Sequence, residues 1–240
     1  MIRPVILEKM ATKISKAIEQ LYEEAGFDLA NTTFGIVPLY ELIDAAYPLR
    51  VIEKKDLTYK LAAEFLSAEI GNPISLPRND DKLLSGFLYA KLVYGCILVN
   101  DNDPIARRRF SVAHELGHYV LHFLSLIDEA SIEEEPEKMI LYEGLVKSES
   151  DEDEKTLTGE LTFTRVTGRQ ASTYDIAQME AEANQFAAEL LMPATLCEKL
   201  VEQFIPRFGK ERSVLARRLA IEFLVSKSAM IRRLDDLNLP

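Results

Sequence analysis

The stretch His114-Glu115-Leu116-Gly117-His118 constrains the fold of this chain more than any other part of the sequence. On an α-helix the four-residue spacing stacks both imidazoles on one face, about 6 Å apart and within reach of one metal ion. Glu115 is rotated off that face, where it can take a proton from an attacking water as a general base. The motif therefore predicts a helix whose histidine face meets a further ligand from another part of the chain.

His122 continues the same stripe, but it does not complete the ligand set. On an unbroken helix His122 lies about 12 Å along the axis from His114, so one ion cannot be bound by both. The sequence also lacks the bend and the third histidine, ten residues after the first, that a metzincin uses. We interpret His122 as a core residue or as a residue that supports a ligand.

A second polar pattern, in residues 180–193, offers the missing ligand. A hydrolytic zinc site commonly takes its third protein ligand, a carboxylate, from a following helix. This segment carries carboxylates and an amide on a predicted helix, together with alanines small enough for close helix packing. Taken alone, without the upstream histidine motif, the segment is better explained as an ordinary amphipathic helix.

The rest of the sequence predicts an α+β protein with a small antiparallel sheet packed on the helix that carries the histidines. Asp56 and Gly71 supply a start and a stop signal for one helix, and Asp103 with Pro104 supplies an N-cap and a first-turn proline for the histidine helix, which runs to about residue 124. Helical patterns also cover residues 1–20 and 175–192, and the chain beyond 193 is helical with breaks near Pro206, Gly209 and Val225. Two antiparallel strands are expected in 86–100, and a strand or hairpin arm in 161–166.

Negative charge is concentrated in one segment of the sequence. The net charge is −11, and between Asp128 and Glu154 twelve acids face two lysines, so the remainder is close to neutral. We expect an acidic insertion at about 128–173 that forms a lid, a docking surface for a basic partner or a solvated loop, and that can lose Glu133 to Glu154 with little effect on folding. No apolar run could span a bilayer, and the N-terminal pattern is that of a cytoplasmic helix. Cys96 and Cys197 have no metal-type spacing and are expected in the core.

The sequence from Arg109 to His118, followed by the segment from Glu180 to Pro193, resembles the ImmA/IrrE family of metallo-endopeptidases. The resemblance implies a minimal gluzincin-like fold with Zn²⁺ held by His114, His118 and Glu180, and with Glu115 as the catalytic residue. It also implies a protein substrate, since family members cleave repressor proteins in stress responses and mobile elements. A helix-turn-helix repressor is the expected partner. His118 and Glu180 stand 62 positions apart, longer than expected for the family, and the acidic insertion accounts for the difference.

Helix geometry separates Glu180 from the neighbouring Glu182. Two residues along a helix differ by about 200°, so only one of the two carboxylates can face the metal. Glu180 lies beside the predicted buried face, in line with Asn184, whereas Glu182 is expected among solvent-facing positions. Asn184 is expected to accept a hydrogen bond from the free ring nitrogen of a ligand histidine.

The chain is expected to divide into a zincin-like peptidase domain, 1–193, and a helical tail, 194–240, that resembles a helix-turn-helix. Eight basic residues make the tail locally positive, namely Arg207, Lys210, Arg212, Arg217, Arg218, Lys227, Arg232 and Arg233. Two packed helices with a charged outer face explain these residues more simply than DNA binding does, so at most a weak nucleic-acid contact through the tail is expected. Tyr89, Tyr94 and Arg109 are candidate oxyanion donors.

One alternative remains open at the level of function. The chain could be a regulatory protein that keeps zinc for structure and binds a partner, or DNA, through its tail. Glu115 between the two histidines speaks against this alternative, because a purely structural site needs no base.

Overall fold

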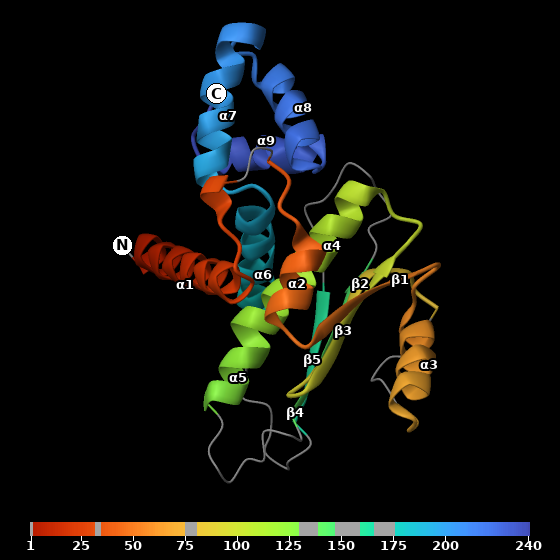
Figure 1. Ribbon diagram of the computed structural model, residues 1–240. Coiled ribbons are helices and arrows are strands. Elements are labelled where there is room, and N and C mark those ends of the chain that lie inside the picture. Colours follow the sequence, from red (N-terminus) through yellow and green to blue (C-terminus); the bar gives the residue numbers. More distant parts are fainter. Residues whose placement is uncertain (1, 32–34, 75–80, 130–138, 147–158, 166–175) are drawn as a thin grey trace.

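The computed structural model describes the chain except for residues 1, 32–34, 75–80, 130–138, 147–158 and 166–175 (Figure 1). The fold is α+β, which confirms the predicted class. Its strands are β1 (Leu49–Lys54), β2 (Leu84–Lys91), β3 (Tyr94–Asn100), β4 (Met139–Val146) and β5 (Gly159–Arg165). They form one sheet in the order β1-β3-β2-β4-β5.

The helices of the described residues account for most of the chain. They are α1 (Ile2–Glu24), α2 (Leu39–Ala46), α3 (Tyr59–Ile70), α4 (Ile105–His118), α5 (Leu124–Glu129), α6 (Ile176–Leu191), α7 (Ala194–Phe208), α8 (Arg212–Phe223) and α9 (Lys227–Asp236), with a 3₁₀ turn at Leu29–Asn31 and a π-helical segment, η2, at Tyr119–Phe123. None of the helices in the described ranges is long and apolar enough to cross a membrane.

The sheet is mixed, and this corrects the predicted small antiparallel sheet. β2 pairs with β3 and with β4, and β4 with β5, all antiparallel, whereas β1 runs parallel to β3. The two strands expected in 86–100 are present as β2 and β3, and β5 covers most of the strand expected in 161–166. β1 is too short, with only Val51 and Ile52 as a β-branched pair, to stand out from the sequence.

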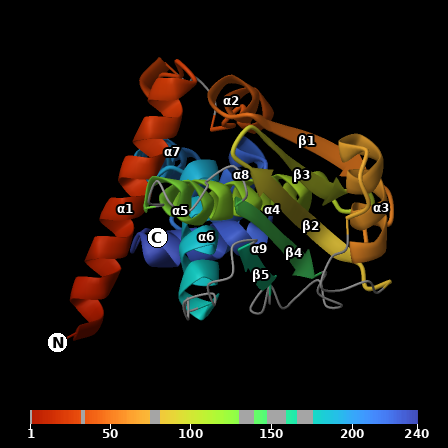
Figure 2. The same cartoon turned by 90° about the horizontal axis from the view of Figure 1, so that it is seen from below.

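The two central strands are buried on both faces. Along β2, Phe87 and Tyr89 pack with α3, whereas Leu88 and Ala90 belong to the larger core on the side of α4. Figures 1 and 2 show α3 alone on one face of the sheet and α1, α4 and α6 on the other. Burial on both faces explains why β2 and β3 read as nearly continuous apolar runs instead of alternating ones.

Several helix boundaries differ from those expected. Thr58, not Asp56, caps α3, its side chain accepting a hydrogen bond from the Leu61 amide at 3.2 Å. Asp56 takes a positive φ of 50° in the preceding turn. Helix α4 begins at Ile105 with Pro104 as its N-cap residue, one position after the expected cap at Asp103. Pro206 lies inside α7 and does not end it, while the expected breaks at Gly209 and near Val225 are present.

The segment expected as an acidic insertion contains two strands, β4 and β5. β4, inside the expected insertion, forms a ladder with β2 on one side and with β5 on the other. The expectation that Glu133 to Glu154 can be removed without harm is therefore wrong, because that deletion takes away an internal strand. The run of acids obscured the strand, although Met139 to Val146 is largely apolar.

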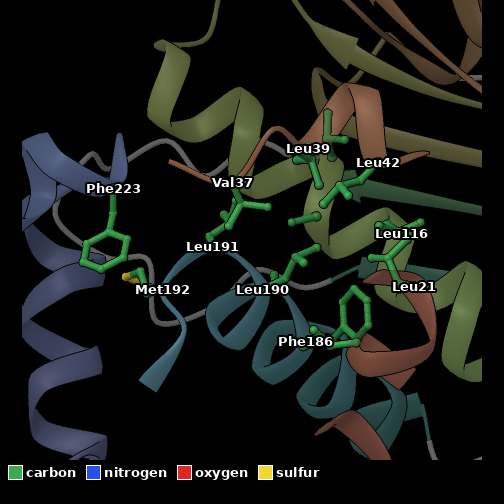
Figure 3. Packing of buried hydrophobic residues seen from close by; sticks show 14 of the residues in the cluster. Leu21, Val37, Leu39, Leu42, Leu116, Phe186, Leu190, Leu191, Met192 and Phe223 are labelled. Carbon is green, nitrogen blue, oxygen red and sulfur yellow. The ribbon is translucent and has the colours of Figure 1, made fainter. Parts of the chain in front are cut away.

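The C-terminal helices pack onto the same core as α6. Figure 3 shows Phe223 of α8 beside Met192, and Leu116 and Leu21 near Phe186. The guanidinium of Arg233 is buried, donates to the Met192 carbonyl at 2.9 Å and pairs with Glu189.

Other basic residues of the tail are also engaged within the chain. Arg212 bonds to Asp235, and Arg218 lies 4.6 Å over the ring of Phe208. The expected basic surface of the tail is smaller than its sequence indicates, because Arg233 is buried in the protein.

The role of β4 can be tested with two deletions. Replacing residues 147–158 by Asn-Gly keeps β4 and β5 and should change the unfolding free energy by less than about 1 kcal/mol. Deleting Glu133–Glu154 removes β4 and leaves one edge of β2 unpaired, so the loss should exceed about 3 kcal/mol. Chemical denaturation followed by circular dichroism measures both variants. Equal midpoints for the wild type and the longer deletion would contradict the position of β4 in the sheet.

Candidate metal centre

Two histidines of α4 form the base of the site. His114 and His118 lie one helical turn apart, and both side chains are fully buried. Their Nε2 atoms are 3.1 Å from each other and point to the same place. The spacing of the sequence motif therefore produces a pair of converging imidazole nitrogens.

Glu180 of α6 completes a cluster of three. Its carboxylate oxygens lie 3.6 Å from His114 Nε2 and 3.4 Å from His118 Nε2. Within the described residues, these three side chains are the group whose ligand atoms could hold one metal ion. Four ligands at 2.0–2.1 Å around a tetrahedral zinc stand about 3.3 Å apart, so the spacing of the three atoms fits such an ion.

Close contact between α4 and α6 makes this convergence possible. A Cβ added to Gly117 would lie 3.1 Å from the Ala183 Cα and 3.2 Å from the Phe186 ring. A larger side chain at Gly117 or Ala183 would separate the two helices and move Glu180 away from the histidines. The small alanines noted in the sequence serve this contact.

Asn184 fixes the orientation of the first histidine. Its Oδ1 lies 3.1 Å from His114 Nδ1. An amide oxygen can only accept, so Nδ1 of His114 carries the proton and Nε2 presents its lone pair to the cluster. This is the contact expected for Asn184 from its position one turn after Glu180.

The second histidine is oriented by a longer chain of contacts. His118 Nδ1 lies 3.0 Å from His122 Nδ1, and His122 Nε2 lies 3.3 Å from the Glu182 carboxylate. Glu182 in turn accepts from Lys13 of α1 at 2.7 Å and from Gln178 at 2.8 Å. The sequence did not reveal this series of hydrogen-bonded side chains. The one local sign of it was the repeat of histidines at 118 and 122.

The expectation for Glu182 was wrong. Its side chain is 7% exposed, because α1 and η2 cover the side of α6 that was taken as solvent-facing. The hydrogen bond from His122, supported by those from Lys13 and Gln178, holds the pKa of Glu182 at about 2, so the carboxylate is ionised. Replacement of Glu182 by alanine is therefore not expected to be silent.

Burial keeps His114 and His118 neutral. It lowers the pKa of His114 to about 3, with a further contribution from His118, and it lowers the pKa of His118 well below its usual value. Two neutral imidazoles therefore meet the Glu180 carboxyl group at a largely buried place. Such a set of acceptors fits a metal cation, since metal binding requires deprotonated ligands.

Glu115 projects from α4 toward β2. Its carboxylate is fully buried, and a Cβ added to Gly86 would lie 2.7 Å from Oε1 of Glu115. The glycine thus lets the strand backbone approach the carboxylate. Glu115 is held beside the cluster but is not part of it.

The three candidate oxyanion donors do not lie at the cluster. Tyr89 and Tyr94 pack on the face of the sheet that α3 covers. Arg109 donates through Nη2 to the Val37 carbonyl at 3.0 Å. Alternation along the strand explains Tyr89, because its neighbours Leu88 and Ala90 are the residues that face α4.

Comparison with known families supports the resemblance inferred from the two motifs. The model of a peptidase family, described as the IrrE N-terminal-like domain, matches residues 74–140 and 156–235. The matched residues make up more than half of the chain and include α4 and α6. No curated protein matches the chain.

Metal affinity tests the cluster. Glu180→Ala removes one of three ligand groups and should lose most of the zinc affinity, and Asn184→Ala should weaken binding by roughly 10-fold to 100-fold. Glu198→Ala, which removes an exposed carboxylate on α7, is the matched control and should bind like the wild type. Competition against a chromophoric chelator measures all three. A Glu180→Ala protein that keeps full affinity would rule out this ligand set.

Proposed function

Because the chain belongs to the peptidase family defined by the IrrE N-terminal-like domain, we propose that it is a zinc-dependent endopeptidase. The observation that carries the proposal is the convergence of His114, His118 and Glu180, with Glu115 buried beside them. Two imidazoles and one carboxylate are a ligand set of catalytic zinc sites, which keep a fourth position for water or substrate.

Each residue of the proposed zinc site has a separate role. His114, His118 and Glu180 hold the ion, and Asn184 keeps the first imidazole in the required tautomer. When bound, zinc would supply a Lewis acid that polarises the scissile carbonyl and acidifies the attacking water. Glu115, which directly follows His114 on α4 and is not one of the three clustered side chains, would act on that water as a base without binding the ion itself.

Glu115 then performs the proton transfers. It takes a proton from the water as the water oxygen bonds to the carbonyl carbon. As the C–N bond breaks, Glu115 passes that proton to the leaving nitrogen, so the products are a free carboxylate and an amine. Its packing against Gly86 limits the positions that the carboxylate can adopt, which favours a fixed base.

A peptide substrate would add to the sheet as a further strand. Among the described strands, β5 is at the edge next to β4, and it contacts α6, the helix that carries Glu180. Glu180 is also the most exposed member of the cluster, at 12% against 0% for the two histidines. Both features support an approach along β5 from the Glu180 side.

The substrate proposed is a protein, and specifically a helix-turn-helix repressor of a stress or mobile-element response in the cytoplasm. This part of the proposal comes from the family resemblance. Co-incubation of the zinc-loaded protein with a small repressor encoded beside its gene tests it, with cleavage followed by mass spectrometry. A repressor that stays intact while other proteins are cut would restrict the proposal to peptidase activity alone.

Replacing Glu115 by glutamine separates binding from catalysis. Glu115→Gln keeps the shape of the side chain but cannot accept the proton, so cleavage of a peptide library should fall roughly 100-fold to 10,000-fold. Zinc content, measured by atomic absorption, should stay at the wild-type level. Wild-type turnover in the variant would refute the mechanism. A zinc-loaded wild type that cuts no peptide would favour the regulatory alternative.

Gly86 provides a second test, one that leaves the ligands untouched. In Gly86→Ala the new methyl group meets Oε1 of Glu115 and displaces the carboxylate, which should lower kcat roughly 10-fold to 100-fold. Metal affinity should change little, because the new methyl group touches none of the three ligand side chains. It also lies 3.2 Å from Cγ of Glu115 and 3.3 Å from Cβ of Ser111, so a small decrease in the unfolding midpoint is expected. A variant with unchanged kcat would show that β2 does not position the base.

A further inference from the structure

A chain of polar contacts connects the N-terminal helix to the metal centre. Lys13 Nζ of α1 lies 2.7 Å from Glu182 Oε2, the same oxygen lies 3.3 Å from His122 Nε2, and His122 Nδ1 lies 3.0 Å from His118 Nδ1. Lys13 stands outside the residues that the family model matches. The chain of contacts therefore brings to the centre a residue that the family match does not include.

We propose that Lys13 is a positioning residue of the metal centre: through Glu182 and His122 it holds His118 in the tautomer and orientation that binds the ion. The inference rests on the metal centre of the proposed function. It assigns to α1 a role in metal binding in addition to its role in the core.

The direction of each hydrogen bond follows from the chemistry of the groups. An ammonium only donates and an ionised carboxylate only accepts, so Glu182 accepts one hydrogen bond from Lys13 Nζ and one from His122 Nε2. Neutral His122 is then left with an acceptor at Nδ1. His118 must donate its Nδ1 proton to that acceptor, and its Nε2 lone pair is directed at the cluster.

A π-helical turn, η2, coincides with this arrangement. It begins directly after His118 and contains His122, whose Nδ1 lies 3.0 Å from Nδ1 of His118. π-Turns inside helices are frequent at functional sites. The sequence predicts an unbroken helix with His122 on the same face as His114 and His118. It does not identify Glu182 of α6 as the partner of His122.

The ammonium group of Lys13 places a positive charge next to the carboxylate of Glu182. The carboxylate is almost completely buried, and its partners His122 and Gln178 are neutral donors. A buried carboxylate without a cation is unfavourable, so Glu182 should turn away from His122 when Lys13 is lost. The neighbouring Ile14 is 1% exposed, and this anchors α1 at the position of Lys13.

The effect of Lys13 should be moderate. Its side chain is 43% exposed, so water screens the pair and replaces part of the lost contact. Residues that contact a ligand histidine directly change metal affinity roughly 10-fold to 100-fold. Glu182 and His122 lie between Lys13 and His118, so we expect replacement of Lys13 to weaken metal affinity by roughly 3-fold to 10-fold.

The test compares Lys13→Met with Lys16→Met, which removes an exposed lysine from the next turn of the same helix. Zinc affinity by chelator competition and the visible absorption of the Co²⁺-loaded protein are measured for both. Lys13→Met should bind roughly 3-fold to 10-fold more weakly with a shifted Co²⁺ band. Lys16→Met should match the wild type, and Lys13→Arg should restore both values.

A double-mutant cycle separates positioning from a general loss of structure. Glu182→Ala alone should weaken binding roughly 10-fold to 100-fold, and adding Lys13→Met to it should have no further effect. An equal effect of Lys13→Met in both backgrounds, or an unchanged affinity and spectrum in Lys13→Met, would overturn the inference. A wild type that binds neither Zn²⁺ nor Co²⁺ would overturn the proposed function instead.

Discussion

The contact between α4 and α6 at Gly117 and Ala183 determines the geometry of the centre. At this crossing the two helices approach so closely that a single added Cβ would press on the opposite backbone. The candidate ligands lie on either side of it, two on α4 and one on α6. Because interiors are packed as densely as crystals, a wider crossing would be filled by side chains and the three ligand atoms would no longer converge.

Both buried histidines of the cluster have a hydrogen-bond partner at Nδ1. His114 Nδ1–H donates to Asn184 and His118 Nδ1–H donates to His122. In a place of low dielectric, a polar group without its partner is costly. The result is a site with its ligand lone pairs arranged before any ion arrives, so that less ordering free energy is lost on binding.

The sequence predicts the parts of this site that lie within one helix. The i, i+4 histidines and the placement of Asn184 one turn after Glu180 follow from helical spacing alone. Glu182 shows the limit: the angle between it and Glu180 was correct, but the sequence does not say that α1 and η2 cover its side of α6. β4 was missed for a similar reason, because its pairing with β2 is a long-range contact and its local composition is dominated by acids.

The buried guanidinium of Arg233 joins α9 to the C-terminal end of α6, where it meets the Met192 carbonyl and Glu189. Helix α6 thus contacts α9 through Arg233 at its C-terminal end and carries the candidate ligand Glu180 in its first half. Because both groups belong to the same helix, the packing of the C-terminal helices bears on the position of Glu180 and on the spacing of the three clustered side chains.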